Sequence, residues 1–295
     1  MQLHTAFRIA VKQDEYWTTI LTFSLRASTR FHTLTLSREF KDVFTAGLSL
    51  QHLGYLSRVK GDYALSNIAL RRSKCIFNQL NRSFNESYTT GLLAERSLRL
   101  GNANEARELA GRAFDVARNI PVSAIHALLR QGEAALGLLD LAGADQYLHR
   151  ALNQSREVND ISFELQALIA IAELKFRQDD LAEVRKALDE VWQSAKSGPY
   201  PLRQADACNV LVELTLAEGD KPAAIDAATK AYRAPWCDGP PYAYHWGFTK
   251  AKAHLAALGA PEPDMPPFDE SKFEPLPEVE INPRDEYWVD PASLD

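Results

Sequence analysis

The sequence predicts an all-α fold, a right-handed α-solenoid of about five helical hairpins of roughly 40 residues each. Similar residue types recur at spacings of 40, 38, 40 and 40 residues, counted between segments that begin at Gly47, Ser87, Ile125, Leu165 and Ala205. Apolar residues within each unit follow the helical period, and a turn signal divides each unit in two. A fixed period of this length, with helical spacing inside it, is typical of repeat proteins that stack their units into a surface.

The first helix and the turn of each unit are clearest in the fourth repeat. Leu165, Leu168 and Ala172 lie on one helical stripe, and Asp179-Asp180 then interrupts the pattern. Asp180 is a good N-cap for a second helix, because its carboxylate can accept from the first amides of that helix. Acidic or amide residues hold the same turn position throughout: Asp62, Asn102, Asp140, Asp180 and Asp220.

The second helix of each unit carries small or apolar residues four, eight and eleven positions after the cap. The first column is Ser66, Ala106, Ala144, Val184 and Ala224. The second is Leu70, Ala110, Leu148, Leu188 and Ala228, and the third is Ser73, Ala113, Ala151, Val191 and Ala231. One position of the first helix is also small, with Val212 as the exception: Gly54, Ala94, Gly132, Ala172 and Val212. Small residues let helices approach to about 8–10 Å, so we expect the two helices to cross there.

The two ends differ from the repeats and define three predicted segments. Residues 1–44 are a divergent helical cap or a partial repeat, since the helix-compatible run from Tyr16 to Arg30 breaks the register. Residues 45–260 form the superhelix, which ends in a capping helix from about Pro241 to Leu258. Residues 261–295 are an acidic, proline-rich extended tail with eleven acidic and two basic residues.

The tail allows two interpretations. It is either a solubilising acidic extension or a segment that docks in part, in cis or on a partner, through its four large aromatic residues. These residues are Phe268, Phe273, Tyr287 and Trp288.

Composition and motifs exclude several classes of function. The net charge of −6 argues against sequence-independent nucleic-acid binding, and no apolar stretch is long enough for a membrane span. The chain has no G-x-x-x-x-G-K-[ST] phosphate loop and no catalytic or metal-binding motif. Three widely spaced cysteines fit reduced thiols. We therefore expect a cytoplasmic protein that is not an enzyme and has no cofactor, no metal and no catalytic residues.

The repeats resemble the tetratricopeptide repeat over roughly residues 45–234. The resemblance rests on an apolar residue followed by a small one, a Gly-Asp turn and alanines in the second helix, as in Leu53-Gly54 with Gly61-Asp62. The unit is longer than the 34 residues of that family. Longer units of this kind resemble the C-terminal repeats of bacterial signal-transduction ATPases of the NACHT or STAND type, and the segment from Trp236 to Trp246 is similar to the ends of such proteins. This resemblance implies a sensor that assembles with an ATPase.

One column of charged residues is the candidate binding site. Glutamate follows the small residue of the first helix in four units, at Glu95, Glu133, Glu173 and Glu213. Tyr55 holds this position in the first unit, and Arg58 lies on the same face. By resemblance to tetratricopeptide arrays, the column faces the concave side. It is either an acidic ladder that attracts a basic protein or peptide, or a solvated face of good helix formers.

The sequence thus predicts a non-catalytic scaffold that recognises a protein or ligand. The resemblance favours the sensor or interaction part of a STAND-type ATPase system. The alternative is a freestanding adaptor or regulator that binds a peptide in its concave groove.

Overall fold

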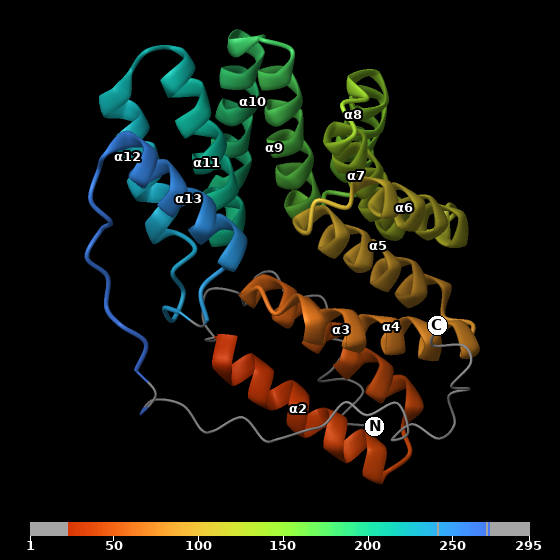
Figure 1. The fold of residues 1–295 in the computed structure, drawn as a ribbon. Helices are drawn as coiled ribbons and strands as arrows, with labels where there is room; N and C mark the ends of the chain where they lie inside the picture. Colours follow the sequence, from red (N-terminus) through yellow and green to blue (C-terminus); the bar gives the residue numbers. More distant parts are fainter. Residues whose placement is uncertain (1–22, 241, 270, 272–295) are drawn as a thin grey trace. The chain divides into compact units, whose positions relative to one another are not determined.

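The computed structural model describes residues 23–240, 242–269 and 271, and its regular elements are all helices (Figure 1). They are α2 (Phe23–Glu39), α3 (Val43–Lys60), α4 (Tyr63–Gln79), α5 (Ser83–Arg99), α6 (Ala103–Ala117), α7 (Pro121–Gly137), α8 (Leu141–Glu157), α9 (Ile161–Arg177), α10 (Leu181–Ser194), the 3-10 helix η2 (Ala195–Ser197), α11 (Pro201–Ala217), α12 (Lys221–Arg233) and α13 (His245–Leu258). This part of the chain contains no strand, and helices pack on their neighbours in sequence. Both findings confirm an all-α solenoid.

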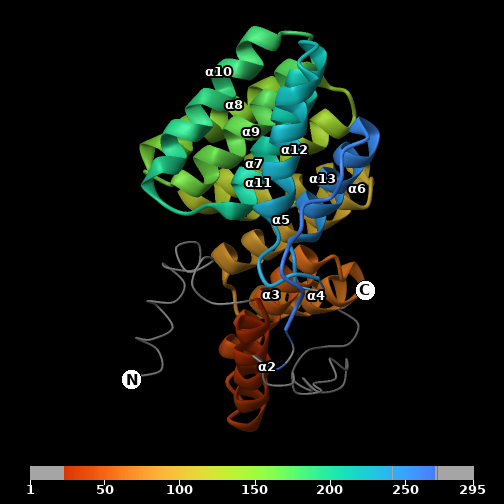
Figure 2. The same cartoon turned by 90° about the vertical axis from the view of Figure 1, so that its left-hand side faces the viewer.

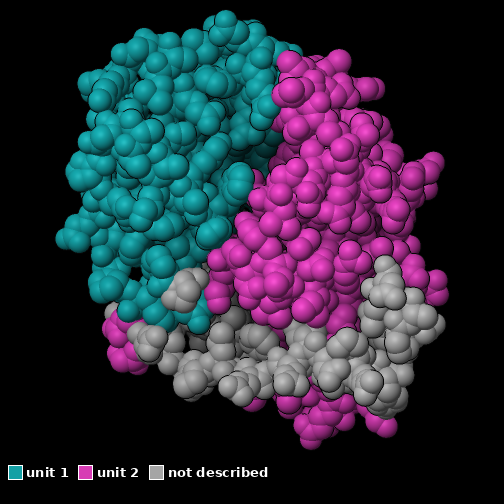
Figure 3. All heavy atoms as spheres, viewed as in Figure 1, with its two compact units in different colours: residues 1–23, 164–268 teal, residues 24–163, 269–295 magenta. Residues whose placement is uncertain are grey.

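The helices belong to two compact units (Figure 3). Among the described residues, unit 2 comprises residues 24–163, 269 and 271. Unit 1 comprises residue 23 and residues 164–268 apart from 241. The division falls in the first turn of α9. Within unit 2, helices α3 and α4 form one hairpin, α5 and α6 the next, and α7 and α8 a third (Figure 2). Within unit 1, α11 and α12 form a hairpin and α13 packs on both.

A single kind of turn sets the period of the repeat. After α3, Gly61 adopts a left-handed φ of 87°, and the N–H of Asp62 donates to the Ser57 carbonyl at 2.8 Å. This is the Schellman arrangement that closes a helix. Asp62 is also the N-cap of α4, because its carboxylate accepts from the Leu65 N–H at 3.0 Å. One residue therefore ends one helix and begins the next, and two helices of about 17 residues with their short turns make up the 40-residue unit.

Left-handed turn residues recur at most connections, although only three of them are glycine. They are Lys41, Gly61, Asn81, Gly101, Leu139, Asn159, Asp179 and Gly219. Leu139 is the least suited to this conformation, with a φ of 61°, and its side chain is 71% exposed. The predicted caps at Asp62, Asp140, Asp180 and Asp220 are confirmed. The prediction is wrong at Asn102, whose side chain makes no capping hydrogen bond.

The two helices of a hairpin cross at the predicted small residues. A Cβ added to Gly54 would lie 2.5 Å from Leu70 Cγ, and one added to Gly132 would lie 2.4 Å from Leu148 Cδ2. Each leucine thus packs directly on a glycine backbone. The three columns of the second helix are all buried, with exposures of 2% or less. The predicted register of the hairpins is therefore confirmed.

In three of the five repeats, the volumes of the two residues at the crossing compensate. Where the first helix has glycine, the second has leucine, as in Gly132 with Leu148. Where the first helix has Val212, the same register of the second has Ala228, and both belong to one buried cluster. The apparent exception in the column of small residues is thus matched by a smaller partner, because a close-packed interior conserves total volume.

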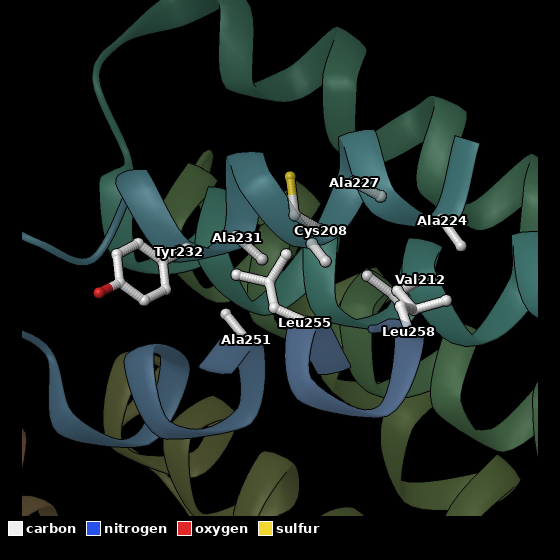
Figure 4. Close-up of a cluster of buried hydrophobic side chains, with 10 residues drawn as sticks. Cys208, Val212, Ala224, Ala227, Ala231, Tyr232, Ala251, Leu255 and Leu258 are labelled. Carbon is white, nitrogen blue, oxygen red and sulfur yellow. The ribbon is translucent and has the colours of Figure 1, made fainter. Parts of the chain in front are cut away.

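The end of unit 1 is covered by α13. Its Leu255 and Leu258 lie among side chains of α11 and α12, including Val212 and Ala231 (Figure 4). The predicted capping helix begins at His245 rather than near residue 241, and it ends before Gly259, which has a φ of 68°. This glycine lies 40 residues after Gly219, so α13 has the register of a first helix of a further unit.

Helix α2 has the register of a second helix. It ends at Glu39, 40 residues before α4 ends at Gln79. Leu34 of α2 is fully buried in a cluster with Ala46 and Leu50 of α3. The break in register expected for residues 1–44 rests on the run from Tyr16 to Arg30, and the part of that run before Phe23 lies outside the described residues, so this expectation stays a prediction.

Alanine substitutions at Gly132 and Leu148 test the packing at this crossing. Gly132→Ala should destabilise the fold by about 1–3 kcal/mol, because the new methyl group overlaps Leu148. Leu148→Ala alone should cost about 2–5 kcal/mol by leaving a cavity. The double variant recreates the Ala94/Ala110 pair of the second repeat and should be more stable than Leu148→Ala. Urea unfolding of the four proteins measures these differences, and additive losses would contradict the assigned contact.

Candidate partner-binding face

First helices of successive hairpins contact one another and form a continuous surface in each unit, here called the A-helix face. In unit 2 it is built from α3, α5 and α7, and in unit 1 from α11, α13 and the part of α9 after Phe163. The predicted site residues divide between the two. Unit 2 brings together Tyr55, Arg58, Glu95 and Glu133, whereas unit 1 contains Glu173 and Glu213.

Glu95 lies at the centre of a buried ion network in unit 2. Its Oε1 lies 2.7 Å from Arg58 Nη1 of α3, and its Oε2 lies 3.0 Å from Arg130 Nη1 of α7. Arg99, one turn along α5, approaches the same carboxylate at 3.5 Å. The side chains of Arg58, Glu95 and Arg130 are only 5%, 6% and 1% exposed. Three helices from three repeats are thus joined through one carboxylate.

Because Glu95 is buried, the predicted acidic ladder is not a row of equally solvated carboxylates. Both interpretations of the column assume solvated carboxylates, and Glu95 is not solvated. Glu133 is partly exposed, and its Oε2 lies 3.1 Å from Arg130 Nη1. The network of Arg58, Arg99 and Arg130 with two glutamates has a formal charge of +1. Its carboxylates therefore do not present a negative surface, and a partner-binding role for these residues stays a prediction.

Aromatic side chains flank the network. The Arg58 guanidinium lies 5.1 Å from the centre of the Tyr55 ring, within cation–π range. In the same unit, the rings of Tyr88 and His126 are 4.6 Å apart. A Cβ added to Gly91 would lie 2.5 Å from His126 Nδ1, so this glycine lets the imidazole lie against α5.

Sequence reasoning missed Arg130. Arg58 and Arg130 do not occupy equivalent positions of the repeat, so comparing columns cannot pair them with Glu95. The only available signal is that each is a basic residue close to one period, 37 and 35 positions, from the same glutamate.

In unit 1, the other two glutamates of the column share one lysine of the terminal helix. Lys250 Nζ of α13 lies 3.3 Å from Glu213 Oε1 and 3.9 Å from Glu173 Oε1. Burial by itself lowers the pKa of this ammonium, but the two carboxylates outweigh it and leave the pKa raised. Two carboxylates against one ammonium give this cluster a formal charge of −1, opposite to that of the network in unit 2.

His254 lies one turn after Lys250. Burial lowers the pKa of its imidazole, Lys250 adds to this effect, and Glu213 opposes it. Its Nε2 is buried and has no hydrogen-bond partner among the described residues. The neutral ring is therefore favoured in the folded chain.

A polar groove of about 460 Å³ lies elsewhere in unit 2, between α4 and α6 over α5. Its lining carries both signs of charge. The basic residues are Arg71, Lys74, Arg96 and Arg112, and the acidic ones are Glu86, Glu105 and Glu108. Because these charges nearly balance, the groove favours neither an anionic nor a cationic ligand.

Chemistry-bearing groups are sparse in the described part of the chain. No set of three or more His, Cys, Asp or Glu side chains there is placed to hold a metal ion. Cys75 and Cys208 are buried, and burial raises the pKa of the Cys208 thiol to about 11. None of the described helices combines the length and the apolar character that crossing a membrane requires.

Comparisons with known proteins support the fold alone. No protein-family model and no curated protein matches the sequence. Among solved structures, the chain is similar to BtubC (BKLC) from P. vanneervenii, with a TM-score of 0.53 and 13% sequence identity. The match covers 83% of this chain and 96% of that one. At this identity the likeness shows a shared helical architecture.

Removing the central carboxylate tests the network. Glu95→Gln should destabilise the protein by about 3–5 kcal/mol, because buried Arg58 loses its counter-charge and buried Arg130 keeps only Glu133. Glu213→Gln is the matched control in the same repeat column, where Glu213 is 29% exposed, and should cost about 0–1 kcal/mol. Both values come from urea unfolding at neutral pH. Equal losses would show that Glu95 is no more buried than its counterpart.

The pH dependence of stability tests His254. Its pKa is lowered in the folded chain, so the unfolded chain takes up the proton first, at about pH 6.5. The stability due to neutral His254 should be complete above that value and be lost as the pH falls through it. His254→Gln should remove this part of the slope below about pH 6.5. Unfolding curves that differ by a constant over this range would contradict the lowered pKa.

Proposed function

We propose that the chain is a non-catalytic recognition scaffold that binds a protein or peptide on its A-helix face. The observation that carries this proposal is the ordered row of charged and aromatic side chains on first helices that contact one another. Groups held by packing and ion pairs lose little side-chain entropy on binding, which favours recognition. Tyr55, Arg99 and Glu133 supply the partly exposed rim of this surface in unit 2.

The charges of the two units favour different groups on the partner. The cluster of Glu173, Glu213 and Lys250 has an excess negative charge, so the predicted basic partner retains support in unit 1. The network around Glu95 has an excess positive charge, so an acidic or neutral group is favoured in unit 2.

The finer proposal is that the repeats are of the tetratricopeptide kind and form the sensor part of a STAND-type ATPase system. Its support is the resemblance of the repeats and of the Trp236–Trp246 segment. The alternative is a freestanding adaptor in the cytoplasm. An ATPase that co-purifies with the chain from its native host supports the first, and a different partner on the same face supports the second.

Site-specific photocrosslinking tests the proposed face. A benzophenone amino acid at Tyr55 or Glu213 should form crosslinks to the same partner in the native host. The control is the same group at Arg107, which is exposed on α6, a second helix. Equal crosslinking from Arg107, or none from the other two positions, would contradict a partner-binding A-helix face.

A further inference from the structure

An extended, proline-rich segment packs against an aromatic cluster in unit 1. The segment is Pro261–Phe268, which follows α13 directly. The cluster, here called the aromatic cradle, consists of Tyr232 of α12, Phe248 of α13, and Trp236 and Tyr242 between the two helices. Tyr232, Trp236 and Phe248 contact one another with ring centres 4.8–5.6 Å apart.

Sequence alone restricts this segment to an extended conformation. Every residue from 260 to 267 except Asp264 is a proline or precedes one. Proline fixes its own φ, and the residue before it is driven to the β or polyproline II region. Little conformational entropy is then lost when the segment lies on a surface. Burial alternates as expected, since Pro263 and Met265 are half-buried whereas Glu262 and Asp264 are exposed.

The indole of Trp236 in the aromatic cradle forms a hydrogen bond with the backbone of the segment. Trp236 Nε1 donates to the Pro266 carbonyl at 3.0 Å. An extended segment of this kind makes no hydrogen bonds within itself, so its carbonyls need an outside donor. An aromatic-lined groove with such a donor is the general chemistry by which proline-rich segments are recognised.

Specific side-chain contacts fix the direction and register of the segment. Glu262 accepts from the Tyr232 hydroxyl at 2.9 Å and lies 2.9 Å from Lys252 Nζ. Four residues later, the Pro266 carbonyl meets Trp236. Between them, Met265 packs against the apolar core of α11–α13.

The far end of the segment is also held closely. The rings of Phe268 and Tyr242 are 4.9 Å apart. A Cβ added to Gly239 would lie 3.2 Å from the Phe268 nitrogen, so a glycine is needed for this approach. The contacts from Glu262 to Phe268 therefore select an acidic side chain, a backbone carbonyl four residues later and an aromatic ring, on a segment that its prolines hold extended.

We infer that the aromatic cradle is a recognition site for proline-rich segments, occupied in cis by Pro261–Phe268. The partner that fits it is another protein's segment with a carboxylate four residues before a Pro-Pro pair. Such a segment competes with the chain's own. This site is separate from the predicted glutamate column and does not depend on the function proposed above.

Binding in trans tests the inference. The probe is a fluorescein-labelled peptide of residues 259–269, and fluorescence anisotropy measures its affinity for the full chain. The wild type should bind weakly, because a tethered competitor is present at an effective concentration of about millimolar. Glu262→Lys with Met265→Asp should release the internal segment and strengthen peptide binding at least about ten-fold.

Two controls separate recognition from a general loss of packing. Adding Trp236→Phe keeps a ring but removes the donor, and should weaken peptide binding to the released chain several-fold. A peptide with Pro263, Pro266 and Pro267 replaced by alanine should not bind. Circular dichroism verifies that each variant is helical.

If the released variant is helical but binds the peptide no more tightly than the wild type does, the inference is wrong. The segment would then only cover the apolar core of unit 1. Binding that is indifferent to Trp236→Phe would overturn it as well. Should the double substitution unfold the chain, Glu262→Lys alone serves as the released variant. It should still bind the peptide more tightly than wild type, and the absence of any gain would overturn the inference.

Discussion

The close crossing of two helices within each hairpin is the constraint on which the rest of the structure depends. At Gly54 and Gly132 the second helix approaches so closely that its leucine touches the backbone of the first. A hairpin that crosses in this way still has apolar surface on both sides and must stack on its neighbours. Stacking brings α3, α5 and α7 together, and only then can side chains from three repeats meet at Glu95.

Much of the fold could be predicted because it depends on local rules that repeat. The turn residues and the buried columns are each determined by helix geometry, so five copies of the pattern reinforce one another. Asn102 shows the limit of such reasoning, since the right residue type at the right position makes no capping bond. The matching of Val212 with Ala228 could be recognised only once the two columns were known to touch.

The environment of the glutamate column could not be predicted in the same way. Periodicity places Glu95 and Glu213 at one position on a helix, but their surroundings come from side chains that do not repeat. Glu95 meets arginines of the two adjoining hairpins, whereas Glu213 meets a lysine of the terminal helix. Equivalent positions in an array can thus differ in solvation and charge, because one residue outside the pattern is enough to change them.

The ion network has a consequence for how this array can change its length. Solenoids commonly gain or lose whole modules, since each hairpin contacts only the next. Here the first three hairpins each contribute a different charged group to one buried cluster. Deleting or duplicating the middle module would leave an arginine without its carboxylate or place two carboxylates side by side. The modules of this region are therefore not interchangeable, and recombination between these repeats is penalised.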